Sequence, residues 1–160
     1  AVALRQPGPE LLLVRRSAEL ARHPGQIAFP GGRIEPTDDG VVGAALREAE
    51  EETGLKAASV RTVGLLPEQR TPTGWVISPV LGVADDPGGL RSCPREVEEL
   101  LLLPVAALLE PLAFSRVTRR SRGLLVHGDA LIWRDRVVWG ATARILLGLR
   151  RVLRAALAPS

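Results

Sequence analysis

The chain has 160 residues, of which 46% are hydrophobic and 24% charged, an ordinary composition for one globular domain. Its formal net charge of +3 falls far short of a nucleic-acid-binding footprint, and no apolar run reaches the ~18 residues of a membrane helix. Cys93 is the single cysteine and excludes an internal disulfide, so we expect a cytoplasmic protein with neither a nucleic-acid nor a membrane partner.

The N-terminal third is predicted to form short strands before a first helix. The apolar segments AVALR and LLLVRR flank a Pro-Gly turn, which is typical of a strand pair. A turn-rich stretch, ARHPGQ, leads to a short apolar IAF and the turn PGG. From Val41 the apolar residues recur at helical spacing, and Gly54 stands where a helix would end. We therefore predict a helix over residues 40–53, with Asp38 or Asp39 at its N-cap.

The rest of the chain mixes strands and helices without a regular order. ASVRTVGLL, GWVISPVLGVA and ELLLL read as strands, and PVAALLE as a short helix with proline at its first position. GLLVHG and ALIWR predict a strand pair, and ATARILLGLRRVLRAAL predicts a closing amphipathic helix. This order favours an α/β fold with a mixed sheet flanked by helices, in a single domain over residues 1–160, and disfavours a doubly wound parallel sheet.

The helix predicted over residues 40–53 concentrates glutamates on one face. At about 100° per residue, Glu51 lies about 60° from Glu48 on one side and Glu52 about 40° from it on the other. Glu50 points away, and Arg47 lies one turn before Glu51, where it can hold that carboxylate. Like charges at these spacings repel, so a cation is expected to offset them.

This acidic face favours a divalent metal site. Carboxylates on a rigid helix face are the hard oxygen ligands that Mg²⁺ and Mn²⁺ require, and the turn Gly31-Gly32 can add a backbone carbonyl. Both ions also bind phosphates, so we infer a metal–phosphate site. An isolated acidic run is more often a solvated helix face. Here the apolar stripe beside the acids and the glycine turn before them weigh against that reading.

Residues 47–55, REAEEETGL, resemble the second half of the Nudix box, which is Arg-Glu-apolar-any-Glu-Glu-any-Gly-apolar. Every position matches. The first half departs from the pattern, because one additional residue separates Gly32 from Arg47 and Asp38 or Asp39 replaces the first Glu. We expect the additional residue to bulge the loop before the helix, where insertions are tolerated.

The resemblance implies a three-layer α/β/α sandwich and hydrolysis of a nucleoside diphosphate linked to another moiety. It implies catalytic roles for Arg47, Glu48, Glu51 and Glu52, and binding of Mg²⁺ or Mn²⁺ by the carbonyl of Gly32 with the three glutamates. Water attacks a phosphorus while the metal offsets charge on the phosphate oxygens. The general base stays open among Glu48, Glu52 and a downstream acid.

The preceding segment, LLLVRRSAELARHPGQIAFPGG, resembles the additional signature of the coenzyme A pyrophosphatase branch of that family. One position departs, because the signature expects an arginine where Ala21 stands, and Arg22 is the nearest substitute. This resemblance implies cleavage of coenzyme A, or a derivative, to 3′,5′-ADP and 4′-phosphopantetheine. The residues implied in substrate binding are Arg16, Ser17, Arg22, Gly25, Phe29, Pro30 and Gly31.

Further downstream, LLPEQRTPTGWVISPVLG and WGATARIL are similar to later segments of the same branch. The branch tends to carry acids near Glu96 and Glu99, and we predict Glu99 as a second-site metal ligand or base, with a strand-edge charge as an equal alternative. The basic run RVTRRSRG is interpreted as a solvated loop rather than a site for the 3′-phosphate. The tryptophans are expected in the core; they are Trp75, Trp133 and Trp139.

Two alternatives stay open. The same chemistry on ADP-ribose or a dNTP would keep the box and treat the upstream segment as shared ancestry. A nucleotide-binding domain without catalysis is suggested by the inserted residue and the missing first Glu. The oligomeric state is open between a monomer and a homodimer.

Overall fold

The computed structural model describes residues 2–5, 8–85, 88–121 and 123–158. Its main sheet has the strand order β3-β2-β1-β7-β4, and β8 also pairs with β2. β1 and β7 run parallel, whereas the other pairs run antiparallel, so the sheet is mixed as predicted. The strands are β1 (Val2–Arg5), β2 (Pro9–Arg16), β3 (Ile27–Ala28), β4 (Arg61–Leu65), β7 (Val80–Ala84) and β8 (Val97–Pro104).

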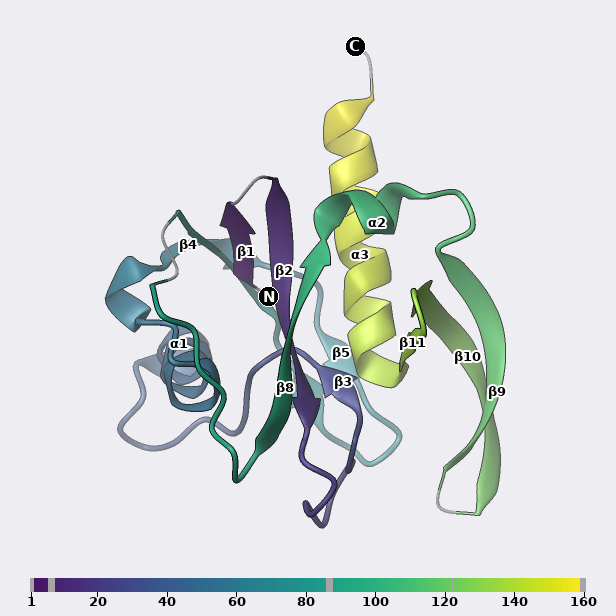
Figure 1. Cartoon of the computed structure of the whole chain (residues 1–160), viewed down its shortest axis with the longest axis horizontal. Coiled ribbons are helices and arrows are strands. Elements are labelled where there is room, and N and C mark those ends of the chain that lie inside the picture. The colour runs from purple at the N-terminus through teal and green to yellow at the C-terminus, as the bar shows by residue number, and fades with distance from the viewer. Residues whose placement is uncertain (1, 6–7, 86–87, 122, 159–160) are drawn as a thin grey trace.

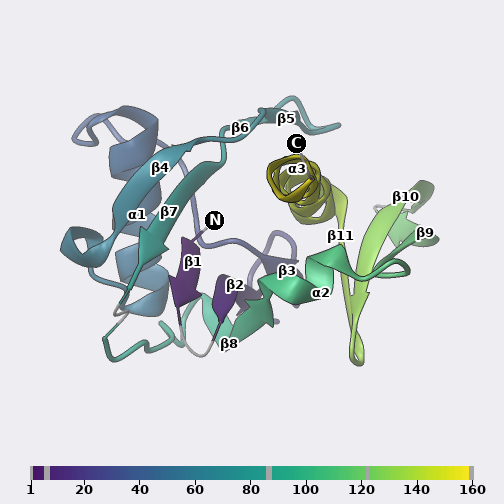
Figure 2. The same cartoon turned by 90° about the horizontal axis from the view of Figure 1, so that it is seen from above.

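Two helices cover opposite faces of this sheet. Figures 1 and 2 show α1 (Gly40–Thr53) on one side and α3 (Gly140–Leu157) on the other, which confirms the α/β/α sandwich. Beyond α3 lies a second, antiparallel sheet in the order β11-β10-β9. Its strands and the smaller elements are β9 (Phe114–Ser121), β10 (Leu124–Trp133), β11 (Arg136–Trp139), the 3-10 helix η1 (Ala57–Ser59), α2 (Val105–Leu109), β5 (Gln69–Arg70) and β6 (Val76–Ile77).

Strand β2 separates two apolar clusters. Leu11 and Leu13 are buried in the larger cluster together with residues of β8 and α3. Leu12, which lies between them, is buried in a smaller cluster with Leu55 and Ala84. Successive side chains of a strand point to opposite faces, and burying one leucine contributes about 1.5–3 kcal/mol. The continuous leucines of β2 therefore fasten both layers and fix the position of the strand's C-terminal end.

The observed bounds of α1 agree with the helix predicted over residues 40–53. Gly54 ends the helix in the left-handed region, with φ of 70°, and its N–H donates a 2.9 Å hydrogen bond to the carbonyl of Glu50. Asp39 holds the N-cap position, but its side chain makes no capping hydrogen bond. The side chain of Asp38 instead accepts hydrogen bonds from Arg47.

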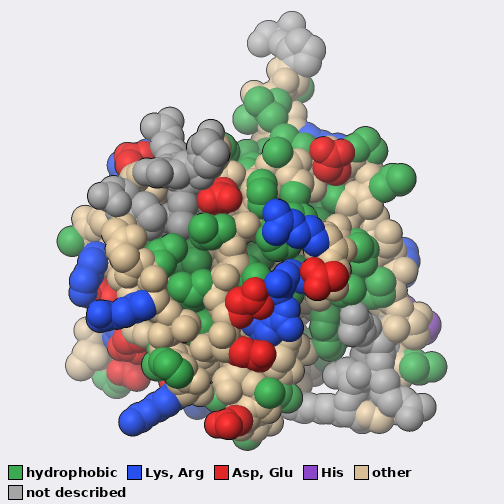
Figure 3. All heavy atoms as spheres, viewed as in Figure 1, with side chains coloured by type: hydrophobic (Ala, Val, Ile, Leu, Met, Phe, Trp, Pro, Cys, Tyr) green, Lys and Arg blue, Asp and Glu red, His purple; other side chains and the backbone are tan. Residues whose placement is uncertain are grey.

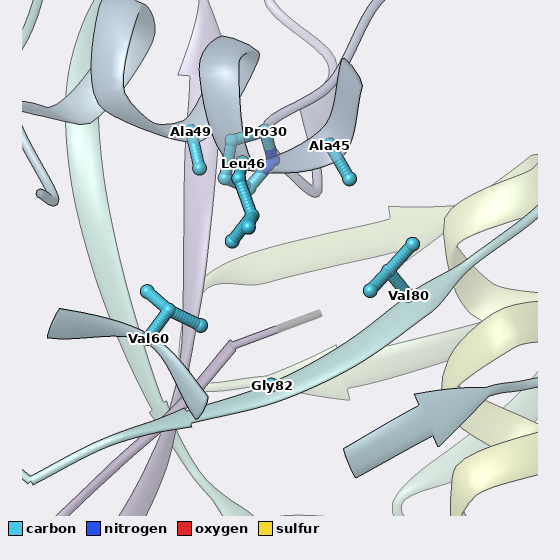
Figure 4. A pocket seen from close by; sticks show the side chains of 7 residues that line it. All are labelled: Pro30, Ala45, Leu46, Ala49, Val60, Val80 and Gly82. Carbon is cyan, nitrogen blue, oxygen red and sulfur yellow. The ribbon is translucent and has the colours of Figure 1, made fainter. Parts of the chain in front are cut away.

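A small apolar pocket lies between α1 and the sheet (Figure 4). A Cβ added to Gly82 would lie 2.6 Å from Cγ1 of Val60. The glycine therefore allows the backbone of β7 to pack closely against Val60. The lining side chains are all apolar, and a pyrophosphate would find no charged partner among them. They belong to Pro30, Ala45, Leu46, Ala49, Val60 and Val80, with Gly82 at the floor.

Four sequence predictions differ from the structure. GLLVHG and ALIWR form one strand, β10, whose partner β9 contains most of the run that was expected to be a loop. Arg122 of that run lies outside the described residues. GWVISPVLGVA is divided into β6 and β7 at Pro79, which has no N–H to donate to a ladder. Trp75 was expected in the core but is 48% exposed.

On the face drawn in Figure 3, basic and acidic side chains alternate near the middle and do not form a continuous basic surface. This agrees with the small net charge of +3. Among the described residues, none of the helices combines the length and the apolarity needed to cross a bilayer.

Candidate active site

Arg47 connects the loop before α1 to two of the glutamates on the helix. Its Nε donates to Oδ1 of Asp38 at 2.8 Å, and Nη2 donates to Oδ2 of Asp38 and to the carbonyl of Arg33, both at 3.0 Å. Nη1 donates to Glu48 at 3.0 Å and to Glu51 at 3.2 Å. The bond to Glu51 confirms the predicted one-turn pair. Arg47 therefore sets the position of the loop before α1 relative to the acidic face.

Asp38 occupies the place where the resemblance expected a glutamate. Its side chain is 4% exposed. Hydrogen bonds from Arg47 and from the backbone N–H of Glu35 hold the pKa of its carboxyl below the usual range. A carboxylate bonded in this way to a guanidinium is fixed in orientation. The inserted residue thus leaves an acid in contact with Arg47.

Glu52 is the most buried of the acids on α1, with 3% of its surface exposed. Its Oε2 accepts a 3.1 Å hydrogen bond from the backbone N–H of Gly31. Burial raises the pKa of Glu52 to about 7, the nearby charge of Glu48 adds to this rise, and Gly31 and Arg16 oppose it. The Glu52 carboxyl can therefore gain or lose a proton near neutral pH.

Glu48 lies directly against the glycine turn. A Cβ on Gly32 would overlap the carboxylate of Glu48, so this close approach requires a glycine. Burial raises the pKa of Glu48, and the hydrogen bond from Arg47 opposes that rise. The side chain of Glu51, by contrast, is 60% exposed. The predicted face is real, and it runs from the buried Glu52 through Glu48 to the solvent-facing Glu51.

The residues fit a divalent cation, although the arrangement is not closed around one. Within the part of the chain that the structure describes, no three acidic, histidine or cysteine side chains converge closely enough to hold an ion as they stand. Arg47 instead bonds both Glu48 and Glu51. Besides burial, the charge of Glu96 raises the pKa of both the partly buried Glu48 and the buried Glu52, and Glu48 also raises that of Glu52. Hard oxygen donors crowded in this way are the ligand set that Mg²⁺ and Mn²⁺ favour.

The upstream residues lie beside this face. At the end of β2, the N–H of Arg16 donates to the carbonyl of Gln26 at 2.9 Å, and the N–H of Gly25 donates to the carbonyl of Arg16 at 3.0 Å. Ser17 is buried, and its N–H donates to the carbonyl of Glu96 at 2.8 Å. The charge of Arg16 acts on Glu52. The turn that contains Gly25 is therefore tied to the strand end that reaches the acids.

Other members of the predicted substrate-binding set have different surroundings. Phe29 is partly buried and packs against the larger apolar cluster. Pro30 lines the apolar pocket under α1. Arg22 is exposed on the turn between β2 and β3. Gly31 differs from Phe29, Pro30 and Arg22. Of these four residues, as the structure describes them, only Gly31 makes a hydrogen bond to a glutamate of α1.

The structure does not bring Glu99 to the acidic face. Arg136 of β11 donates to both of its carboxylate oxygens, at 2.8 and 2.9 Å, and Arg15 approaches it to 3.2 Å. Glu99 shares the parity of Leu101 and Leu103 in β8, both buried in the cluster on the α3 side. Because alternate residues of a strand share a face, Glu99 points away from α1.

Glu96 is the downstream acid that acts on the site, since its charge raises the pKa of both Glu48 and Glu52. Sequence reasoning noted this residue but selected Glu99 as the ligand. The alternation in β8 contains the signal that separates them, because Glu99 follows the pattern of the buried leucines whereas Glu96 precedes the strand. Glu96 is held there by the backbone hydrogen bond between its carbonyl and Ser17.

Comparison with known proteins identifies the family. Residues 1–122 match the family model described as "NUDIX domain". The chain is 38% identical over 144 residues to "Uncharacterized Nudix hydrolase NudL" of Shigella boydii serotype 4, covering 89% of this chain and 74% of the relative. A protein of the same name in Escherichia coli O6:H1 has the same identity and coverage. The chain belongs to the Nudix hydrolases, which act on pyrophosphate bonds and generally use divalent cations.

Solved structures support the fold. A Nudix hydrolase from M. smegmatis, RenU, superposes with a TM-score of 0.61 at 17% identity, over 99% of this chain and 83% of that one. A C. elegans Ap4A hydrolase in a binary complex gives a TM-score of 0.55 at 17% identity, over 66% of this chain and 76% of that one. At these identities the likeness concerns the fold alone, and it agrees with the α/β/α arrangement in Figure 2.

Proposed function

We propose that this Nudix hydrolase cleaves the pyrophosphate of coenzyme A, or of a coenzyme A derivative, to 3′,5′-ADP and 4′-phosphopantetheine. The observation that carries the proposal is the hydrogen bond from Gly31 to Glu52, with Arg16 close enough to act on the same carboxylate. Gly31 and Arg16 belong to the segment that resembles the coenzyme A branch, and Glu52 belongs to the Nudix box. The two signatures thus meet at one place.

Arg16 is suited to bind a phosphate of the substrate. Its Nε is buried and has no hydrogen-bond partner among the described residues. A buried donor without a partner costs about 1–3 kcal/mol, so an anionic ligand that accepts from it would be stabilised. Guanidinium groups bind phosphate oxygens in a fork geometry. Ser17, next in the chain, is buried and held by its backbone, which keeps this strand end in place.

The carbonyl of Gly32 and the carboxylates of Glu48, Glu51 and Glu52 are the proposed ligands of Mg²⁺ or Mn²⁺. When bound, the cation supplies positive charge to the phosphate oxygens. Arg47 positions Glu48 and Glu51 through its hydrogen bonds. Glu52 is buried and Glu48 is partly buried, so the field of these two carboxylates is screened less by water than that of the exposed Glu51.

The reaction needs a base that takes a proton from the attacking water as its oxygen bonds to phosphorus and the bridging oxygen leaves with the other phosphate. Glu48, Glu52 and Glu96 are the acids near enough to one another to share that role. In the metal-free protein burial raises the pKa of Glu52 to about 7, and a cation bound beside it would favour the ionised carboxylate that a base needs. Arg22, Gly25, Phe29 and Pro30 are proposed to complete the substrate-binding wall.

Product analysis by mass spectrometry tests the proposal. The purified chain is incubated with coenzyme A, ADP-ribose, a dNTP and diadenosine tetraphosphate, each with Mg²⁺ or Mn²⁺ and with a chelator control. We expect 3′,5′-ADP and 4′-phosphopantetheine from coenzyme A, lost with chelator and with Glu52→Gln. Faster turnover of another nucleotide would replace the substrate assignment and retain the hydrolase. Absence of all turnover would favour a nucleotide-binding domain.

A further inference from the structure

Trp75 is an aromatic side chain that the core does not use. It is 48% exposed, although a tryptophan normally buries most of its large surface. It lies in the connection between β5 and β6, which Figure 2 shows beside α3 and away from the second sheet. An exposed tryptophan held at one place is a candidate surface for a flat ligand.

The hairpin that carries Trp75 is tightly bonded. The N–H of Thr71 donates to the carbonyl of Trp75 at 2.8 Å, and the N–H of Trp75 donates to the side-chain Oγ1 of Thr71 at 3.0 Å. Gly74 closes the turn with φ of 86°. From α3, Arg144 donates to Oε1 of Gln69 at 3.2 Å and to the carbonyl of Arg70 at 3.1 Å. The ring is therefore presented from a fixed backbone.

One side chain connects this ring to the candidate active site. Cζ of Arg33 lies 4.6 Å from the centroid of the Trp75 ring, within the range of a cation–π contact. Arg33 directly follows Gly32, and its carbonyl accepts the 3.0 Å hydrogen bond from Arg47. Trp75 is thus one arginine side chain away from the loop that faces the glutamates.

We propose that Trp75, with Arg33 against it, is the stacking platform for the nucleobase of the substrate. Every nucleobase has a π-face, and an aromatic side chain can stack on it whichever base it is. Arg33 adds positive charge next to the phosphates. This inference rests on the proposed function to the extent that the base belongs to a substrate whose pyrophosphate lies at Glu48 and Glu52. It assigns to Trp75 a role in affinity rather than in the chemical step.

Titration calorimetry with ADP and with inorganic pyrophosphate, each in the presence of Mg²⁺, tests this assignment. We expect Trp75→Ala to weaken ADP about ten- to a hundredfold and to leave pyrophosphate within about twofold, because the latter has no base. Trp75→Phe retains a π-face and is expected to restore most of the affinity for ADP. Val76→Ala, a 44% exposed residue of the same hairpin, is the matched control and is expected to bind both ligands like the parent chain.

The assignment is overturned if Trp75→Ala binds ADP like the parent, if it weakens ADP and pyrophosphate equally, or if the parent itself does not bind ADP more tightly than pyrophosphate. Equal weakening would assign a purely structural role to the hairpin. Hydrolysis assays separate this outcome from failure of the proposed function. A parent chain that cleaves coenzyme A without dependence of KM on Trp75 retains the function and loses the platform. A chain that binds ADP through Trp75 and cleaves nothing retains the platform and loses the function.

Discussion

Asp38 and Arg47 are joined by two hydrogen bonds, of 2.8 and 3.0 Å, across the loop that precedes α1. The aspartate side chain is nearly buried at 4% exposure, and the arginine reaches from it to Glu48 and Glu51. An acid shorter than the glutamate of the family pattern thus holds the arginine of the box.

Asp38→Asn is expected to release Arg47 from the loop. Hydrogen bonds to charged groups contribute about 1.5–3 kcal/mol, so unfolding by denaturant should show a loss of this order. Glu48 and Glu51 would lose a fixed partner, and kcat should fall about ten- to a hundredfold through misplacement. Asp39→Asn is the matched control, because its exposed side chain caps nothing. Equal effects of the two substitutions would contradict a specific role of Asp38.

Gly32→Ala is expected to impair metal binding more than folding. The new Cβ would overlap the carboxylate of Glu48, which must then turn away from the glycine carbonyl. The concentration of Mn²⁺ for half-maximal activity should rise about tenfold or more, since shifting a ligand costs at least as much as losing its support. Gly128→Ala serves as control, because a Cβ there meets open space in β10. An unchanged metal titration in Gly32→Ala would show that this contact is not needed.

The buried carboxyl of Glu52 makes the stability of the metal-free protein depend on pH. Its pKa rises from 4.5 to about 7 on folding, so between these values the folded state binds more protons than the unfolded state. The free energy of unfolding therefore falls as pH rises from about 4.5 to about 7 and levels off above, by at most about 3 kcal/mol. Glu52→Gln, which cannot ionise, should flatten this slope.

Denaturant unfolding at a series of pH values, with chelator present, measures this slope. Mg²⁺ stabilises the ionised carboxylates, so adding it should reduce the fall in stability toward neutral pH. Glu98→Gln, on the exposed edge of β8, is the control that removes a charge without removing a buried carboxyl. A parent slope that Glu52→Gln leaves intact would assign the pH dependence to another group. The same variant should lose activity by about a hundredfold or more if Glu52 holds the metal or the proton.

The sequence predicted α1 correctly because its signals are local. The apolar spacing from Val41 and the left-handed Gly54 lie within the helix or at its end, and the acidic face follows from their periodicity. The long hairpin of β9 and β10 escaped prediction, because its pairing joins residues through a ladder that no single segment reveals. The exposure of Trp75 likewise depends on contacts of its hairpin with α3, which composition does not report.

The alternation of side chains in β8 places Glu99 on the face away from α1, which the family motif alone does not predict. As a carboxylate 38% exposed and bonded to Arg15 and Arg136, it links the main sheet to the second sheet through β11. Glu99→Gln is expected to destabilise the fold by about 0.5–2 kcal/mol, a modest value because solvent screens part of this ion pair. Its kcat and its metal dependence should stay those of the parent.

Glu96→Gln provides the opposite expectation. Removing this charge eases the repulsion on Glu48 and Glu52, so the pKa of each should fall and the pH at which activity reaches half its maximum should move down. If Glu96 also contacts the cation, about tenfold more Mn²⁺ will be needed. Parallel pH–rate profiles and metal titrations of Glu96→Gln and Glu99→Gln show which of the two acids acts on the site. A changed metal titration in Glu99→Gln with none in Glu96→Gln would place the second acid at Glu99 and require the end of β8 to rearrange when metal binds.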